Sequence, residues 1–213
     1  MYVEYVPNGI KVTQNSYKET LKEMNIEDPV DPSRRLTRRE FKDFRGLVGK
    51  LNWLSEVSRP DLAFDTLDMA SFTKDATVKQ AQRLNKVVRK ASELDNEILY
   101  SKIGDETDLK ILAISDAALN KRENKTQSIM GKSVFLSNLA ETKVCPIVLK
   151  SKTIQTVCRS AKDAETRGFE KTAEEAIYIA RSLKEILTAR TTAGHYGHGF
   201  TITDRLYKQY KTD

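Results

Sequence analysis

The chain has 213 residues, of which 39% are hydrophobic and 31% charged, so it is long enough to bury a core in one large domain or two small ones. Its formal charge of +6 fits a nucleic-acid partner and equally an ordinary lysine-rich surface. The sequence has no run of 18 apolar residues and no secretory signal, and Cys145 and Cys158 lack metal-site or disulfide-framework spacing. We therefore expect an intracellular protein of a reducing compartment, with no membrane insertion.

The first 35 residues predict a hairpin, a short helix and a linker. Alternating residues break at the Pro-Asn-Gly sequence of positions 7–9, which is typical of a turn between two strands. Ser16 is placed to cap a helix that runs to about residue 24. Residues 27–35 contain two prolines and several charges, which indicates an exposed linker.

A small helical region is predicted next. Thr37 and Glu40 have the spacing of a capping box, and apolar residues then recur at helical intervals over 38–56. Pro60 is placed to set the first turn of a second helix. A third helix is predicted near 77–93, where apolar residues line one side and basic residues the others. This pattern is typical of a solvated helix and also of one that grips nucleic acid.

From residue 98 the hydrophobic period changes to that of strands. Short runs rich in β-branched residues predict three or four antiparallel strands, at residues 98–102, 109–115, 129–136 and 144–149. The longest helix follows over about 162–189, with an apolar stripe that includes Phe169 and Ile177. Glycines then precede a last strand at 199–203. A strand, a crossover helix and a second strand in one sheet imply parallel, right-handed pairing.

Three carboxylates accompany these elements. Asp116 and Asp204 stand just past the carboxyl ends of two predicted strands, and Glu165 lies in the first turn of the long helix, on its expected sheet-facing side. If strands 109–115 and 199–203 are neighbours, the three acids converge. A divalent cation would relieve their repulsion, and oxygen ligands suit Mg²⁺ or Mn²⁺. Taken singly, each acid is also an ordinary turn or helix-start residue.

The order of elements therefore predicts an α/β protein with a ribonuclease H-like mixed sheet, in which antiparallel strands are joined by one parallel strand after a long helix. A small helical region precedes this sheet. In such folds, paired metal ions held by carboxylates promote phosphodiester hydrolysis. The fold alone does not establish that catalysis is retained.

Several motifs, in order, resemble one family. The segments Phe44-Arg-Gly-Leu-Val-Gly-Lys-Leu-Asn-Trp-Leu54 and Arg59-Pro-Asp-Leu62 resemble the region that joins reverse transcriptase to ribonuclease H in copia-type (Pseudoviridae) retrotransposon polyproteins. The segments Ser115-Asp-Ala117, Pro146-Ile-Val-Leu-Lys-Ser-Lys152, Ala164-Glu-Thr166 and Ala176-Ile-Tyr178 resemble the ribonuclease H domain of that family. The start, Gly9-Ile-Lys-Val-Thr-Gln14, resembles the stretch after the polymerase palm.

The resemblance implies Mg²⁺-dependent cleavage of RNA in RNA–DNA hybrids, with Asp116, Glu165 and Asp204 as metal ligands and catalytic residues. It also implies a division of the chain into a reverse transcriptase remnant, a helical connection and a truncated ribonuclease H-like domain, at residues 1–35, 36–97 and 98–213. The palm and its polymerase aspartates are absent, so we expect no polymerase activity.

Two departures from the family affect the expected activity. The family continues past the third acid through a helix, a strand and a fourth acid, whereas this chain stops at Asp213. Arg205 stands where the family has a small polar residue, and its charge would compete with a metal. A second hypothesis is therefore a catalytically inactive, domesticated remnant that serves as an RNA-binding or structural subunit of a ribonucleoprotein complex. A protein partner would then cover the truncated sheet edge.

Basic residues offer nucleic-acid contacts in two places. One group surrounds the predicted linker and the other flanks the turn into the long helix; the two groups are Arg34, Arg35, Arg38 and Arg39, and Lys150, Lys152, Arg159 and Lys162. Solvated side chains explain both groups nearly as well. His195 and His198 could bind a metal or a phosphate, but no third ligand accompanies them. Trp53 is most simply a packing residue.

Overall fold

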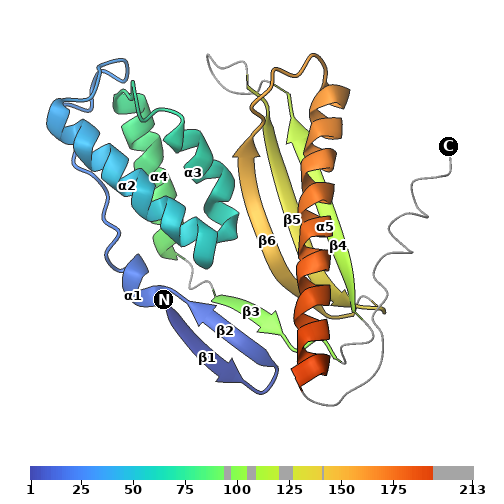
Figure 1. The fold of residues 1–213 in the computed structure, drawn as a ribbon. Helices are drawn as coiled ribbons and strands as arrows, with labels where there is room; N and C mark the ends of the chain where they lie inside the picture. Colours follow the sequence, from blue (N-terminus) through green and yellow to red (C-terminus); the bar gives the residue numbers. More distant parts are fainter. Residues whose placement is uncertain (94–96, 105–108, 120–126, 141, 194–213) are drawn as a thin grey trace.

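The computed structural model describes residues 1–93, 97–104, 109–119, 127–140 and 142–193. In these residues two antiparallel three-stranded sheets and a set of helices form an α/β fold (Figure 1). The larger sheet lies between one long helix and a group of shorter helices (Figure 1). The expectation of an α/β chain with a helical region ahead of the main sheet is confirmed.

The first sheet contains the predicted hairpin and one strand from later in the chain. Its strands, in spatial order, are β1 (Tyr2–Val6), β2 (Gly9–Thr13) and β3 (Glu97–Ser101). We expected β3 to belong with the later strands, and that was wrong. Its register places Ile98 beside Val12 and Tyr100 beside Ile10, so apolar side chains of both strands share one face.

The helical region follows the prediction closely except at its start. It contains α1 (Asn15–Lys18), α2 (Arg38–Val57), the 3₁₀ turn η1 (Pro60–Leu62), α3 (Ala63–Ala70) and α4 (Val78–Glu93). The predicted helix from Ser16 to residue 24 is only one turn long. The Asn85 side chain instead bonds both the backbone N–H and the carbonyl of Met24, at 2.9 Å each, which holds this stretch against α4.

One continuous hydrophobic core unites these helices. Phe44 and Leu51 of α2, Leu62 of η1 and Leu84 of α4 are all fully buried in it. Arg59 is also buried, 1% exposed, and its guanidinium bonds the Asp61 carboxylate and the carbonyl oxygens of Lys90 and Ala91. That side chain therefore fixes the α2–η1 corner to the end of α4.

The second sheet and the long helix form the rest of the described chain. They are β4 (Leu109–Ala118), β5 (Ile129–Asn138), β6 (Val144–Thr153) and α5 (Ala161–Ala193), and the strand order is β4-β5-β6. Helix α5 lies along one face, over β4 and β5, while α3 contacts β6 (Figure 1). An ion pair between Lys150 of β6 and Glu56 of α2, at 3.3 Å, also joins the two regions.

The sheet-facing side of α5 agrees with the predicted apolar stripe only in part: Ala176 and Ala180 of that stripe are buried, but its large residues are not. Its buried positions are small residues, namely Ala164, Gly168, Thr172, Ala176 and Ala180. Phe169 and Ile177, expected in the core, are 45% and 42% exposed. The reason is close packing, because a Cβ atom at Gly168 would lie 3.4 Å from the Cβ of Ala117 in β4. At that separation a large side chain would not fit beneath the helix.

The predicted strand at 199–203, with Asp204, Arg205, His195 and His198, lies outside the described residues. Parallel pairing is therefore absent from the sheets as described, and both sheets are antiparallel there. Within the described segments, no helix combines the length and the apolar character needed to cross a lipid bilayer.

Candidate metal-binding edge and basic helix face

Asp116 lies near the carboxyl end of β4, opposite Gly131 of β5. We expected it just past the end of a strand, but β4 continues to Ala118. Its side chain is exposed, whereas the next residue, Ala117, packs under α5. Because successive strand side chains point to opposite faces, Asp116 is directed away from the face that α5 covers. It belongs to one of the two edge strands of this sheet as described.

Glu165 is exposed in the first turns of α5, so its predicted sheet-facing position is wrong. Ala164, its neighbour, occupies the buried position instead. The backbone of α5 nevertheless passes close to that of Asp116. Gly168, one turn further along α5, would place a Cβ atom 4.0 Å from the carbonyl oxygen of Asp116. Both carboxylates are thus accessible to solvent on adjoining elements.

An open edge lies beside these two acids. In the part of the chain that is described, β4 pairs with β5 alone, so its outer edge has no strand beside it. One flank of α5, with Lys171 and Tyr178, faces β5 and β6. Ile177, 42% exposed, lies on a different side of α5. An unpaired strand edge is suited to receive a further strand.

The metal site expected from three acids is incomplete as described. No group of three or more histidine, cysteine or acidic side chains with metal-binding geometry occurs among the described residues. Asp204, the third predicted ligand, lies outside them. Asp116 and Glu165 offer accessible oxygen ligands, which fit a hard cation such as Mg²⁺ or Mn²⁺.

The nearby basic residues serve different purposes. Arg159 and Lys162 are exposed around the start of α5, and their role in guiding a nucleic-acid backbone stays a prediction. Lys150 is held by the ion pair with Glu56 described above. Lys152 is exposed at the end of β6, on the other flank of α5. Only part of this predicted basic group therefore surrounds the carboxylates.

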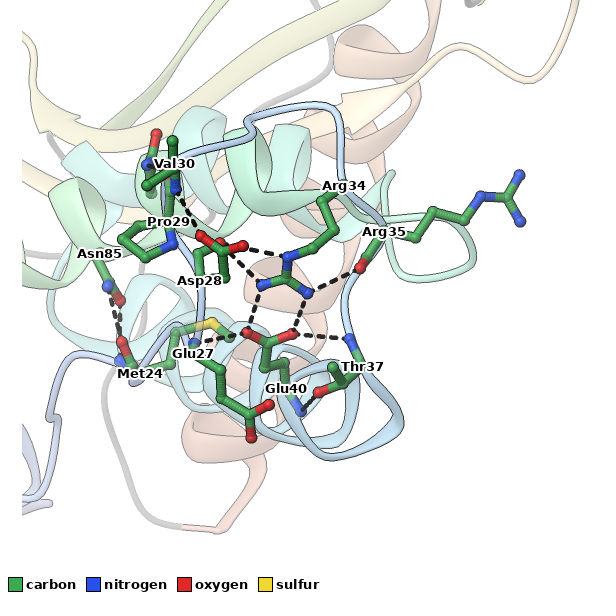
Figure 2. A network of polar contacts seen from close by, with 11 residues as sticks. Met24, Glu27, Asp28, Pro29, Val30, Arg34, Arg35, Thr37, Glu40 and Asn85 are labelled. Atoms are coloured by element: carbon green, nitrogen blue, oxygen red, sulfur yellow. Dashed lines mark hydrogen bonds and ion pairs between the residues drawn. The ribbon is translucent and has the colours of Figure 1, made fainter.

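Arg34 has a structural role that the sequence did not reveal. Figure 2 shows its guanidinium against the buried Glu40 carboxylate, with hydrogen bonds of 2.9 and 3.0 Å, and against the backbone carbonyls of Asp28 and Arg35. Glu40 also accepts from the backbone N–H groups of Glu27 and Thr37, which completes the predicted capping box. The Arg34 guanidinium therefore has partners within the protein, and its predicted phosphate contact stays a prediction.

This network also revises the predicted linker. The Arg34 guanidinium holds the pKa of Glu40 at about 2, well below its ordinary value of 4.5. The Val78 N–H donates to the Arg34 carbonyl, and the Leu36 N–H donates to the Ala76 carbonyl. Residues 27–36 therefore tie the start of α2 to the start of α4.

The remaining arginines lie beside a basic face of α2. Arg38, Lys42 and Arg45 recur at helical spacing and are exposed, and a shallow depression of about 490 Å³ lies among them. Arg35 and Arg39 are exposed nearby. We did not predict a role for Lys42 and Arg45, although their spacing from Arg38 is visible in the sequence.

The same helix face continues into glycine and tryptophan. Gly46 and Gly49 face open space, because a Cβ atom at either would meet nothing within 4 Å. Trp53, one turn beyond Gly49, is 51% exposed, so its prediction as a packing residue is wrong. The cations on this face can pair with phosphates, and the glycines leave room for the backbone to approach. The exposed indole can stack on an unstacked or terminal base. We call the surface of Arg38, Lys42, Arg45, Gly46, Gly49 and Trp53 the α2 basic face.

Comparisons with known proteins found no match. No family model matches the chain, and neither a curated protein nor a solved structure matches it.

Proposed function

We propose that this chain is a ribonuclease H-like nuclease of copia-type retrotransposon origin that binds RNA–DNA hybrids and hydrolyses their RNA strand with Mg²⁺ or Mn²⁺. The observation that carries the proposal is the pair of exposed carboxylates, Asp116 and Glu165, on β4 and α5 beside an open sheet edge. The order of three antiparallel strands followed by a long covering helix supports it.

In this proposal the residues of the chain have separate roles. Asp116 and Glu165 would hold the metal around the outer edge of β4, because Asp116 points away from the sheet face that α5 covers. Asp204 would join them if its strand pairs with that edge. The metal would activate the attacking water and stabilise the leaving oxygen. Arg159 and Lys162, exposed at the start of α5, neutralise backbone phosphates near the acids.

The α2 basic face favours a second candidate function, which is nucleic-acid binding without cleavage. Three cations and two open glycines allow a phosphate backbone to approach the helix closely, and Trp53 provides a surface on which a base can stack. This surface needs no metal and no third acid. It would serve an inactive retroelement remnant that holds RNA inside a ribonucleoprotein complex, with a protein partner over the edge of β4.

A cleavage assay on an RNA–DNA hybrid separates the two candidates. The full chain is incubated with the labelled hybrid in Mg²⁺ and then in Mn²⁺, alongside Asp116→Asn and Glu165→Gln. Glu185→Gln is the matched control, because Glu185 is an exposed acid further along α5. We expect cleavage by the wild type and by the control, and at least a 100-fold slower rate in the two site variants.

Binding is measured on the same samples by fluorescence anisotropy. If the wild type binds the hybrid but leaves it intact with both metals, the nuclease proposal fails and the binding candidate stands. If all four proteins cleave equally, the activity does not come from these carboxylates. Loss of binding in Arg45→Ala and Trp53→Ala, with the fold intact by circular dichroism, assigns the contact to the α2 basic face.

A further inference from the structure

A cleft of about 830 Å³ lies on the flank of α5 away from the outer edge of β4. The start of β5 and the end of β6 form one wall, and α5 forms the other between Arg167 and Tyr178. Its size is typical of a small-molecule site. The cleft plays no part in the proposed nuclease site or in the α2 basic face.

Three lysines lie together on the sheet wall of this cleft or next to it. Lys132 of β5 pairs with Lys150 of β6, and Lys152 lies two residues further along β6, opposite Met130. Like charges on facing positions repel each other. Burial lowers the pKa of Lys132, and the charges of Lys152 and Lys150 lower it further. The cluster therefore requires negative charge for balance.

Two of these lysines are already balanced. Lys132, only 6% exposed, forms an ion pair with Glu175 of α5, and Lys150 pairs with Glu56. Lys152 is exposed and forms no ion pair with any acid among the described residues. Its ammonium group lines the cleft and is available to a ligand.

The opposite wall limits what that ligand can be. Lys171 is paired with Glu174 at 2.8 Å, and Arg167 bonds Asp163 and the Thr156 hydroxyl. Glu170 lines the cleft without an ion-pair partner among the described residues, so a highly charged polyphosphate would be repelled. A single phosphate on a sugar fits better, because Glu170 can accept from sugar hydroxyls while the phosphate lies at Lys152.

Apolar and aromatic groups complete the site. Met130 and Ile154 supply apolar wall, and Tyr178, 71% exposed, stands at the cleft with a ring on which a base can stack. We propose that this cleft binds a nucleoside monophosphate unit, either free or at the end of a nucleic-acid strand, with Lys152 on the phosphate and Tyr178 on the base.

The test uses isothermal titration of the full chain with three probes, which are adenosine 5′-monophosphate, adenosine and a short RNA with a terminal phosphate. Variants Lys152→Ala and Tyr178→Ala are compared with Lys184→Ala, which removes an exposed lysine of α5 outside the cleft. Metal is omitted, so failure of the nuclease proposal does not affect the result.

We expect the monophosphate to bind at least tenfold more tightly than adenosine, and Lys152→Ala to weaken it at least tenfold while Lys184→Ala has no effect. If the RNA alone binds, and Lys152→Ala weakens that binding while Lys184→Ala does not, the unit recognised is a strand end. The proposal is overturned if no probe binds, or if Lys184→Ala weakens binding as much as Lys152→Ala. Circular dichroism of each variant separates loss of binding from loss of fold.

Discussion

The helical region and the β4–β6 region differ in how completely they bury their apolar side chains. Helices α2 to α4 enclose one continuous core, and even their buried charges, Arg59 and Glu40, have full sets of partners. The β4–β6 sheet instead holds two small clusters under α5. Ile114, Ile147 and Phe169 remain 60%, 43% and 45% exposed there.

This contrast indicates which region is built for stability and which for contact. A closed core with paired charges contributes to folding free energy and leaves its outer face, here the α2 basic face, free to bind. A sheet with an open edge and half-exposed apolar residues gains by receiving another segment or a partner. Asp116, one of the candidate metal ligands, lies on the strand that forms this edge.

We expect the two regions to differ most in the free energy of unfolding that is lost when a large apolar side chain is shortened to alanine. Leu51→Ala removes a fully buried side chain of α2 and should lower the free energy of unfolding by about 3 kcal/mol. Ile114→Ala removes an exposed side chain of β4 and should cost less than about 1 kcal/mol. Urea denaturation of both variants measures this. Equal losses would mean that the face of β4 carrying Ile114 is covered in solution.

A smaller effect should appear in acid. The pKa of Glu40 is about 2 in the folded chain and 4.5 ordinarily, so its stabilisation is complete above about pH 4.5 and is lost as the pH falls toward 2. Glu40→Gln should therefore destabilise the chain by about 2 kcal/mol at pH 7 and by less at pH 3. Thermal denaturation at both values tests this. Asp43→Asn, at an exposed acid of the same helix, is the matched control.

The smallest effect concerns the glycines of the α2 basic face. Alanine at Gly46 meets nothing within 4 Å, so Gly46→Ala should stabilise the helix by about 0.5–1 kcal/mol. The added methyl group should at the same time weaken nucleic-acid binding severalfold, because it blocks close approach of the backbone. Thermal melts and fluorescence anisotropy on one preparation measure both. Tighter binding in the variant would show that the glycines do not serve contact.

The sequence predicted helices, strands and caps better than it predicted which distant residues each side chain contacts. The capping box of Thr37 and Glu40 and the strands of the main sheet followed from local spacing and were confirmed as elements. The partner of β3 and the role of Arg34 depend on contacts between distant segments, which local periodicity does not encode.

The candidate site shows the same limit. Large apolar residues at Phe169 and Ile177 suggested the buried side of α5, whereas close packing against β4 selected Ala164 and Gly168. That choice placed Glu165 on the exposed side. The sequence therefore identified Asp116 and Glu165 as candidates but did not predict their exposure or the sheet face of Asp116. Asp204 stays a prediction.

In the function proposed above, Asp116 and Glu165 hold a divalent metal at the open edge of β4. Mn²⁺ binding measured by electron paramagnetic resonance tests it without any substrate. We expect the wild type and Glu185→Gln to bind Mn²⁺ alike, and Asp116→Asn and Glu165→Gln each to weaken binding at least tenfold. Undiminished Mn²⁺ binding in both site variants, or no binding in the wild type, would contradict the account.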